Sequence, residues 1–484
     1  MYEIRSQDDG TQRKNASSVY RRKGFSMTAS ISESRIKELT AKEGEKLNAK
    51  LGKSREMYNE ARKHLCNGVA SSYQLRDPWP IYVDHGSGSK LWDVDGNEYY
   101  DFHNGYGAMV QGHGNPEIGK AIAERFPKGT HFALPDEDDF VVADELTQRF
   151  GLPKWRFTNS GSEATMDAIR IARAYTHRDH IMKIFGSYHG HHDAVMISIV
   201  GDYENIGDKN HLKKIPYGAG IPKSLIPLTV PVPFNDADAL EARIREMETD
   251  DEAPACLIME ACLMNMSIVP PEPGYLEKVR EITKRHGIVL IFDEVKTGLT
   301  IGPGGATKLF GVTPDMVTMA KAISGGLPMG AIGGTDEVMS VVESGEVYQV
   351  GTYSGNPLCV AAARANLEKV LTPEAYKLFD HLNNRLMEGC TEVIKKYDFP
   401  GYSIGFGAKG CVTFSPHKII DYVTFKQGQR TDLNQLCWLY AANRGVFMTP
   451  GREEEWTLSV AHDDAACDAY INAFAEMAHD VTAE

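Results

Sequence analysis

Residues 288–294, IVLIFDE, form a short apolar run that ends in two acidic residues, Asp293 and Glu294. An uninterrupted apolar run of this length predicts a strand buried on both faces, and the helical pattern YLEKVREITKRHG precedes it directly. The same pairing occurs upstream, where ADALEARIREME precedes the apolar run ACLIME. Helices that alternate with buried strands predict a mainly parallel, doubly wound α/β sheet.

This alternation extends over residues 116–345, which we predict to form one large domain. It includes the apolar runs HIMKIF and AVMISIV, the second at residues 194–200, which we expect to be strands. Residues 31–115 pass from a helical pattern into IYVDHGSGSKLWDVDGNEYYDF, which predicts a small antiparallel sheet. We expect this segment to supply an interface and the N-terminal part of a smaller α+β domain, which residues 346–484 complete. Residues 1–30 are expected to be a disordered extension.

The composition is that of a large globular protein. The chain has 484 residues, 42% of them hydrophobic, and its 52 basic and 66 acidic residues give a formal net charge of −14. This charge repels nucleic acid and anionic lipid, and no apolar stretch reaches the roughly 18 residues of a membrane helix. We therefore expect neither nucleic acid nor a membrane as a partner. Eight scattered cysteines without a CxxC pair predict a reducing, cytoplasmic compartment.

Three motifs are similar to other binding sites but have the wrong context. GNPEIGKA ends in Ala121, which lacks the hydroxyl that holds magnesium in a P-loop. GFGAKG at residues 405–410 has the glycine spacing of a dinucleotide site, but the strand-like CVTF follows where that site needs a helix. The histidines and the aspartate of residues 189–193 are too close in sequence to converge on one ion, so we expect no metal.

Three features that follow predicted strands point to one cofactor. NSGS at residues 159–162 ends a strand and opens a helix, whose N-terminus attracts an anion. An acid such as Asp293 at a strand end suits a protonated ring nitrogen, and Lys321, after DMVTMA, suits attack on a carbonyl. Taken singly, these features also fit a helix cap, a salt bridge to Lys296 and a surface lysine. Taken together, they match the phosphate, pyridine nitrogen and aldehyde of pyridoxal phosphate.

At these residues the sequence resembles the class III aminotransferase family of fold type I pyridoxal phosphate enzymes, and within it the glutamate-1-semialdehyde aminomutase branch. The similarity covers roughly residues 45–480 and includes NSGSEATMDAIRIARAYT, SYHGHHD, FDEVKTG and GTYSGNP. It implies the fold type I architecture, in which a large doubly wound sheet domain is joined to a smaller α+β domain. It also implies a homodimer with active sites at the interface.

The resemblance further implies which residues hold the cofactor. Gly161 and Ser162 are expected to bind its phosphate, and Asp293 its pyridine nitrogen. Lys321 is expected to form the Schiff base and to carry the proton, and Tyr188 to stack on the ring, so that Lys321, Asp293 and Tyr188 are the expected catalytic residues. The other implied contacts are Ser160, His189, Glu260, Asn265 at the phenolic oxygen, Val295 on the opposite ring face, and Thr352, given to the neighbouring subunit.

The sequence predicts the substrate contacts less directly than the cofactor contacts. Aminomutases of this branch carry an arginine for the substrate carboxylate in the loop after the first helix, and Gln74 stands at that place. Arg76 and Arg452 are the residues that we expect to bind a carboxylate instead. The sequence favours an aminotransferase that moves an amino group between an amine or non-α amino acid, such as a β-amino acid, and a keto acid or aldehyde. Intramolecular amino transfer, epimerase or lyase chemistry, and a binding protein without catalysis are the alternatives.

Overall fold

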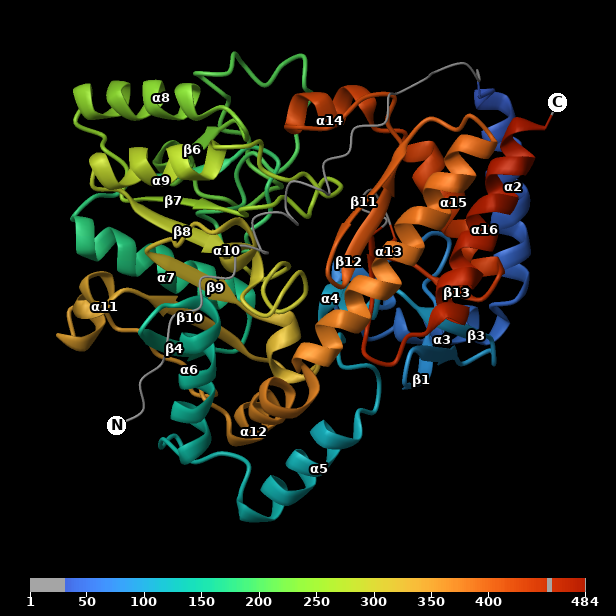
Figure 1. Ribbon diagram of the computed structural model, residues 1–484, viewed down its shortest axis with the longest axis horizontal. Coiled ribbons are helices and arrows are strands. Elements are labelled where there is room, and N and C mark those ends of the chain that lie inside the picture. The colour runs from blue at the N-terminus through green and yellow to red at the C-terminus, as the bar shows by residue number, and fades with distance from the viewer. Residues whose placement is uncertain (1–30, 451–454, 484) are drawn as a thin grey trace.

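A computed structural model describes residues 31–450 and 455–483, and its centre is a seven-stranded sheet (Figure 1). In spatial order, the strands are β4 (Lys154–Thr158), β10 (Gly330–Gly334), β9 (Met316–Met319), β8 (Val289–Asp293), β7 (Cys256–Met259), β5 (Ile181–Ile184) and β6 (Thr229–Val232). All neighbours from β9 to β6 are parallel, whereas β10 is antiparallel to both β9 and β4. The predicted mainly parallel sheet is confirmed.

Helices cover both faces of this sheet, because successive strand side chains point to opposite sides. Ile258 and Ile291 pack in one apolar cluster with the helices of the first face, whereas Leu257 and Leu290 belong to the core on the other. The first face carries α7 (Gly161–Thr176) and α11 (Asp336–Glu343), and the second carries α8 (Ala237–Thr249) and α9 (Tyr275–Arg285) (Figure 1).

One predicted strand is wrong. Residues 194–200 form no strand in the described structure, where a single bridge joins Ile197 to Pro216. Val195, Ile197 and Ile199 are buried, so the apolar run that suggested a strand belongs to a loop that packs into the core. The preceding strand β5 already pairs with β6 and β7, which leaves no free edge beside it.

The two ends of the chain meet in a second α+β region, on the right of Figure 1. Its N-terminal helix packs against α15, and β3 pairs in parallel with β13. The exact domain limits stay a prediction, and residues 1–30 lie outside the described residues. The elements of this region are α2 (Glu33–Ala49), α3 (Gly52–Ala61), β1 (Val83–Ser87), β2 (Lys90–Asp93), β3 (Glu98–Asp101), α13 (Pro373–Lys396), β11 (Tyr402–Phe406), β12 (Lys409–Thr413), α14 (Tyr422–Gly428), α15 (Thr431–Asn443), β13 (Val446–Phe447), β14 (Glu455–Thr457) and α16 (Asp464–Thr482). The helices that connect the two regions or flank them are α4 (Asn104–Gly107), α5 (Pro116–Arg125), α6 (Glu137–Phe150), α10 (Gly305–Phe310) and α12 (Pro357–Ala365).

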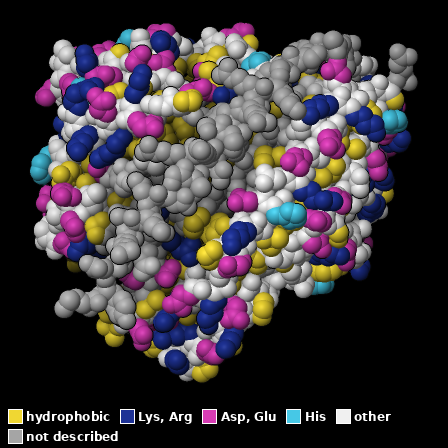
Figure 2. All heavy atoms as spheres, in the orientation of Figure 1, with side chains coloured by type: hydrophobic (Ala, Val, Ile, Leu, Met, Phe, Trp, Pro, Cys, Tyr) yellow, Lys and Arg dark blue, Asp and Glu magenta, His cyan; other side chains and the backbone are white. Residues whose placement is uncertain are grey.

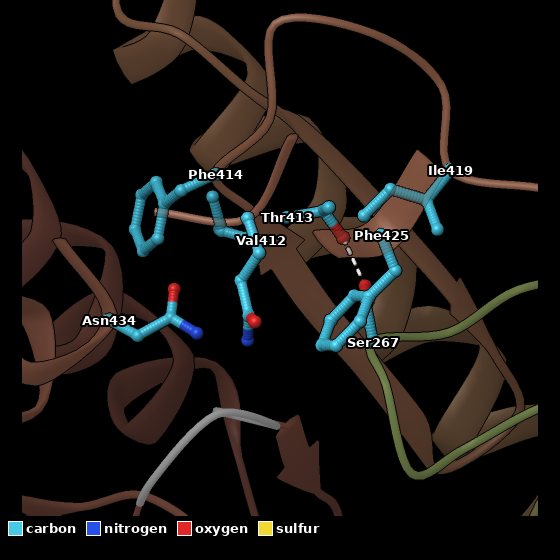
Figure 3. A pocket seen from close by; sticks show the side chains of 8 residues that line it. Ser267, Val412, Thr413, Phe414, Ile419, Phe425 and Asn434 are labelled. Carbon is cyan, nitrogen blue, oxygen red and sulfur yellow. Dashed lines mark hydrogen bonds between the residues drawn. The ribbon is translucent and has the colours of Figure 1, made fainter. Parts of the chain in front are cut away.

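The β11–β12 hairpin docks this region onto loops of the large sheet. Its turn lies within the GFGAKG motif, and Gly407 there has φ +53° and lies so close to Thr300 that an added Cβ would be 2.6 Å from the Thr300 carbonyl oxygen. A strand therefore follows these glycines, as predicted, in place of the helix that a dinucleotide site needs. Ser267 from the large-sheet side hydrogen-bonds Thr413 of β12, beside a small pocket that Phe425 also lines (Figure 3).

A buried ion-pair cluster joins the same two regions. Glu455 of β14 lies 3.2 Å from the Nζ atom of Lys296, which follows β8, and 3.2 Å from the Nζ atom of Lys409 in β12. The side chains of Lys296, Lys409 and Glu455 are 8%, 1% and 1% exposed, respectively, so water screens these pairs little. The cluster therefore ties the segment after Asp293 to the small sheet.

The surface carries both signs of charge and exposed apolar segments, of which residues 348–353 are one. Acidic and basic side chains are interspersed over the face that Figure 2 shows. Tyr348, Val350 and Tyr353 are 78%, 69% and 61% exposed, respectively, which is typical of a surface that another molecule covers. No described helix is long and apolar enough to cross a bilayer.

We predict that Glu455→Gln lowers the free energy of unfolding of the cofactor-free protein by about 3–5 kcal/mol, because two buried ammonium groups lose their shared carboxylate. The matched control is Asp468→Asn. It removes an ion pair with Arg385 whose side chains are 39% and 46% exposed, and we expect a loss of at most about 1 kcal/mol. Urea titration of both variants measures the difference, and equal losses would contradict the prediction.

Candidate active site

Five of the predicted site residues lie along one edge of the large sheet. Ser160 follows β4, His189 follows β5, Glu260 follows β7, Asp293 ends β8 and Lys321 follows β9. These strands all run in the same direction, since β4 and β9 are both antiparallel to β10. Open α/β sheets bind ligands at the carboxyl ends of their strands, so this edge is the candidate site.

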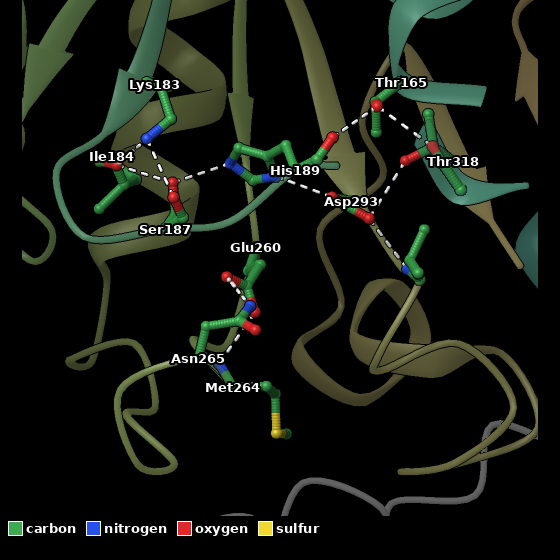
Figure 4. Close-up of polar contacts among 12 residues, drawn as sticks. Thr165, Lys183, Ile184, Ser187, His189, Glu260, Met264, Asn265, Asp293 and Thr318 are labelled. Carbon is green, nitrogen blue, oxygen red and sulfur yellow. Dashed lines mark hydrogen bonds and ion pairs between the residues drawn. The ribbon is translucent and has the colours of Figure 1, made fainter. Parts of the chain in front are cut away.

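Asp293 is a buried carboxylate with hydrogen-bond donors on both oxygens. Its Oδ2 lies 2.7 Å from Nδ1 of His189, and its Oδ1 accepts from the backbone N–H of Val295 at 3.0 Å and from the Thr318 hydroxyl at 3.2 Å (Figure 4). Burial lowers the pKa of His189, so the imidazole is neutral. Three donors around one acid favour its ionised form.

The N-terminus of α7 forms a cradle for an anion. Ser160 caps the helix with its hydroxyl, which accepts from the Glu163 N–H at 3.2 Å. Within the described part of the chain, the N–H groups of Gly161 and Ser162 have no acceptor. An added Cβ on Gly161 would lie 3.0 Å from Val295, so glycine keeps this helix end open. Two free donors and the helix dipole suit a phosphate group.

Glu260 and Asn265 form a second buried polar pair. The Asn265 amide donates to Oε1 of Glu260 at 2.9 Å, and the Met264 N–H donates to Oε2 at 2.9 Å. Burial, together with the nearby charge of Asp293, raises the pKa of Glu260 to about 8. Glu260 is therefore mostly protonated at neutral pH.

Lys321 and Tyr188 occupy the open side of this edge. Lys321 is half-buried and has φ +49°, a left-handed backbone conformation that is uncommon for lysine and is often found at functional sites. The ring of half-buried Tyr188 lies 6.2 Å from that of Tyr73, and Tyr73 lies 5.3 Å from Tyr106. The predicted stacking residue thus belongs to an aromatic cluster.

The predicted substrate residues are differently placed. The side-chain oxygen of Gln74 accepts from the N–H groups of Ala70 and Ser71, so it caps its own loop. Arg76 donates to the carbonyl of Trp79 at 3.0 Å and to Asn48 at 3.1 Å, and its burial lowers the pKa of the guanidinium. Among residues 31–450 and 455–483, Arg76 forms no hydrogen bond or ion pair with the sheet edge.

Of the two remaining predicted residues, the structure describes one. Thr352 is exposed in the segment 351–355, beside Tyr353. Arg452 lies outside the described residues.

Thr318 and Lys183 contact this site but were not predicted from the sequence as site residues. Thr318 donates to Asp293 from the neighbouring strand, and Lys183 is fully buried next to the loop that carries His189. Both were visible as single polar residues within apolar runs, VTMA and IMKIF.

A model of the class-III aminotransferase family matches residues 72–437 of this chain. The chain belongs to this family. It is 37% identical to a glutamate-1-semialdehyde 2,1-aminomutase of Brevibacillus brevis over 428 residues, which are 87% of this chain and 97% of that protein.

Solved structures of the family agree with the fold. An omega-transaminase from Sphaerobacter thermophilus has a TM-score of 0.84 at 34% identity and matches 89% of this chain and 98% of its own. A glutamate-1-semialdehyde aminomutase from Pseudomonas aeruginosa has a TM-score of 0.85 at 27% identity and matches 93% of this chain and 99% of its own. The predicted fold type I architecture is confirmed.

The cofactor of the protein is pyridoxal phosphate, as the sequence predicted. The residues present fit this group. The α7 N-terminus offers two unpaired N–H donors for a phosphate, Asp293 is an ionised acceptor for a protonated ring nitrogen, and Lys321 supplies an amine.

The raised pKa of Glu260 predicts a pH effect on stability. The folded protein keeps this acid neutral up to about pH 8, whereas the unfolded chain ionises it near its ordinary pKa of 4.5. The contribution of Glu260 to the free energy of unfolding is therefore complete below pH 4.5 and is lost as the pH rises toward 8. We expect the free energy of unfolding of the cofactor-free wild type, relative to Glu260→Gln, to fall across this range.

Urea titrations at several pH values measure this difference. Glu281→Gln, at a side chain that is 72% exposed, is the control and should show no such trend. If the free energy of unfolding of the wild type, relative to Glu260→Gln, increased with pH, the raised pKa of Glu260 would be contradicted.

Proposed function

We propose that the protein is a pyridoxal phosphate-dependent aminotransferase. It would move an amino group from an amine or a non-α amino acid, such as a β-amino acid, to a keto acid or aldehyde. One observation carries the choice of substrate: where aminomutases of this branch have a carboxylate-binding arginine, Gln74 caps its own loop. That place thus lacks the cation that binds the single substrate carboxylate in those aminomutases.

Different residues of this chain would have separate roles in the reaction. When bound, pyridoxal phosphate withdraws electrons from the substrate carbon. Gly161 and Ser162 would hold its phosphate, and Asp293, oriented by His189, its ring nitrogen. The Lys321 amine would remove a proton from the substrate carbon and return it one position further on. The other proposed cofactor contacts are Ser160, Tyr188, Glu260, Asn265 and Val295.

The aminomutase reaction is the second candidate, because the curated relatives at 37% identity bear that name. A half-reaction screen separates the two. We expect β-amino acids or plain amines to change the visible absorption of the bound cofactor, and a keto acid or aldehyde to restore it. Isomerisation of glutamate-1-semialdehyde without any added acceptor would instead establish the aminomutase.

We also propose a cytoplasmic homodimer in which Thr352 contacts the cofactor of the partner. The exposed Tyr348, Val350 and Tyr353 flank Thr352 and suit burial against a second copy. All eight cysteines are free, and seven of them are buried, which suits a reducing compartment. We further propose that residues 31–115 and 346–484 build the small domain around residues 116–345.

We predict that Lys321→Ala lowers kcat by at least about 100-fold with every amino donor, because the general base is lost. Lys308→Ala, which changes an exposed lysine of α10, should keep wild-type turnover. Steady-state assays on both purified holoenzymes test this. Full turnover of the Lys321 variant would exclude the proposed chemistry.

Subunit mixing tests the role of Thr352. We expect Thr352→Ala to weaken cofactor binding, since it removes a ligand from the partner's site. When this variant is co-refolded with Lys321→Ala, one site of each heterodimer is intact, so about a quarter of wild-type activity should return for random pairing in a two-fold dimer. If Thr352 acted within its own subunit, each heterodimer site would carry one substitution, and the mixture would stay as weak as its parents.

A further inference from the structure

Lys183 is a fully buried cation that the proposed chemistry does not use. It lies in β5 between β6 and β7, and its side chain is 0% exposed. Its Nζ donates to the carbonyl oxygens of Ile184 at 3.2 Å, Ser187 at 3.0 Å and Ile197 at 3.0 Å. Within the described chain it forms no ion pair with a carboxylate, and burial lowers its pKa to about 7. Burying an amine at this place is costly, so the contacts that it makes need an explanation.

Two of these contacts hold the loop that leads to the active site. Ile184 and Ser187 begin the turn that carries Tyr188 and His189 to the sheet edge (Figure 4). The Ser187 hydroxyl lies 2.7 Å from the Ile184 carbonyl oxygen and 2.8 Å from Nε2 of His189. A hydroxyl has one hydrogen, so Ser187 donates to only one of these neighbours.

The contact at Nδ1 of the imidazole determines whether the Ser187 hydroxyl donates to Ile184 or to His189. Nδ1 of His189 lies 2.7 Å from Oδ2 of Asp293, and an ionised carboxylate only accepts. Nδ1 therefore carries the hydrogen of the neutral ring, and Nε2 is left as an acceptor. Ser187 must then donate to Nε2, and the Ile184 carbonyl is satisfied by Lys183 instead.

We propose that Lys183 and Ser187 are positioning residues that hold the Nε2 side of His189 and thereby orient its Nδ1–H toward Asp293. Lys183 occupies the Ile184 carbonyl, which leaves the Ser187 hydroxyl for His189. The importance of these contacts for catalysis rests on the proposed role of Asp293 toward the cofactor. The hydrogen bond from Ser187 to Nε2 does not, and it is measurable without cofactor.

The test is ¹⁵N NMR of the cofactor-free full-length protein labelled at its histidine rings, with the His189 signals assigned by their loss in His189→Gln. In the wild type we expect the hydrogen on Nδ1. In Lys183→Met the Ser187 hydroxyl turns to the Ile184 carbonyl, and in Ser187→Ala it is absent. In both variants we expect the Nε2 shift to move toward that of a ring nitrogen that accepts no hydrogen bond, while Nδ1 keeps its hydrogen. Lys214→Met, which removes another lysine that donates to a backbone carbonyl, should leave the Nε2 shift unchanged.

Ser187→Thr keeps the hydroxyl and should retain the wild-type Nε2 shift. It also supplies the comparison with Ser187→Ala if Lys183→Met does not fold. A wild-type ring with its hydrogen on Nε2, or an unchanged Nε2 shift in Ser187→Ala, would overturn the proposal. In the holoenzyme we expect Lys183→Met and Ser187→Ala to alter the visible spectrum of the cofactor and to lower kcat more than they change KM. An Nε2 shift that changes as expected in a protein that transaminates no amine would leave this inference standing and refute the proposed function.

Discussion

The hydrogen bond between His189 and Asp293 is the contact on which the rest of the site depends. An acid that is 4% exposed at the end of a central strand is stable as an anion only when donors surround it. Two of its donors come from the sheet itself, because Asp293 pairs in register with Thr318 and its chain turns back to present the Val295 N–H. The position of the acid therefore follows from strand register, and His189 completes it from a third strand.

The proposed phosphate site explains how a protein of net charge −14 would attract an anionic cofactor. The general field opposes binding, so the attraction must be local. It would come from the unpaired N–H groups at the start of α7, which are effective only at short range. Glycine at position 161 and Gly190, where a Cβ would lie 2.6 Å from the Ser162 hydroxyl, allow that approach.

The sequence predicted those parts of the site that follow from one strand at a time. IVLIFDE placed Asp293 at a strand end, and the helix start after NSGS placed the cradle. The contacts of Thr318 and Lys183 could not be predicted, because they depend on which strands are neighbours and in what register. The capping role of Gln74 was equally hidden, since it depends on how one short loop folds on itself. The strand predicted for residues 194–200 was wrong because their apolar side chains are buried in a loop, and no free strand edge lies beside β5.

The proposed cofactor and substrate contacts come from different parts of this fold. The proposed cofactor contacts are fixed dipoles and buried groups at the edge of one sheet, whereas Gln74 belongs to the segment before β1, in the region that the chain ends build together. Glu455 fastens that region to the segment after Asp293 through Lys296. A loop on one side of this joint can change without disturbing the acid on the other. Similarity to both an aminomutase and an omega-transaminase is then expected, because the fold does not choose between the two reactions. On the function proposed above, a few side chains, such as the one at position 74, make that choice.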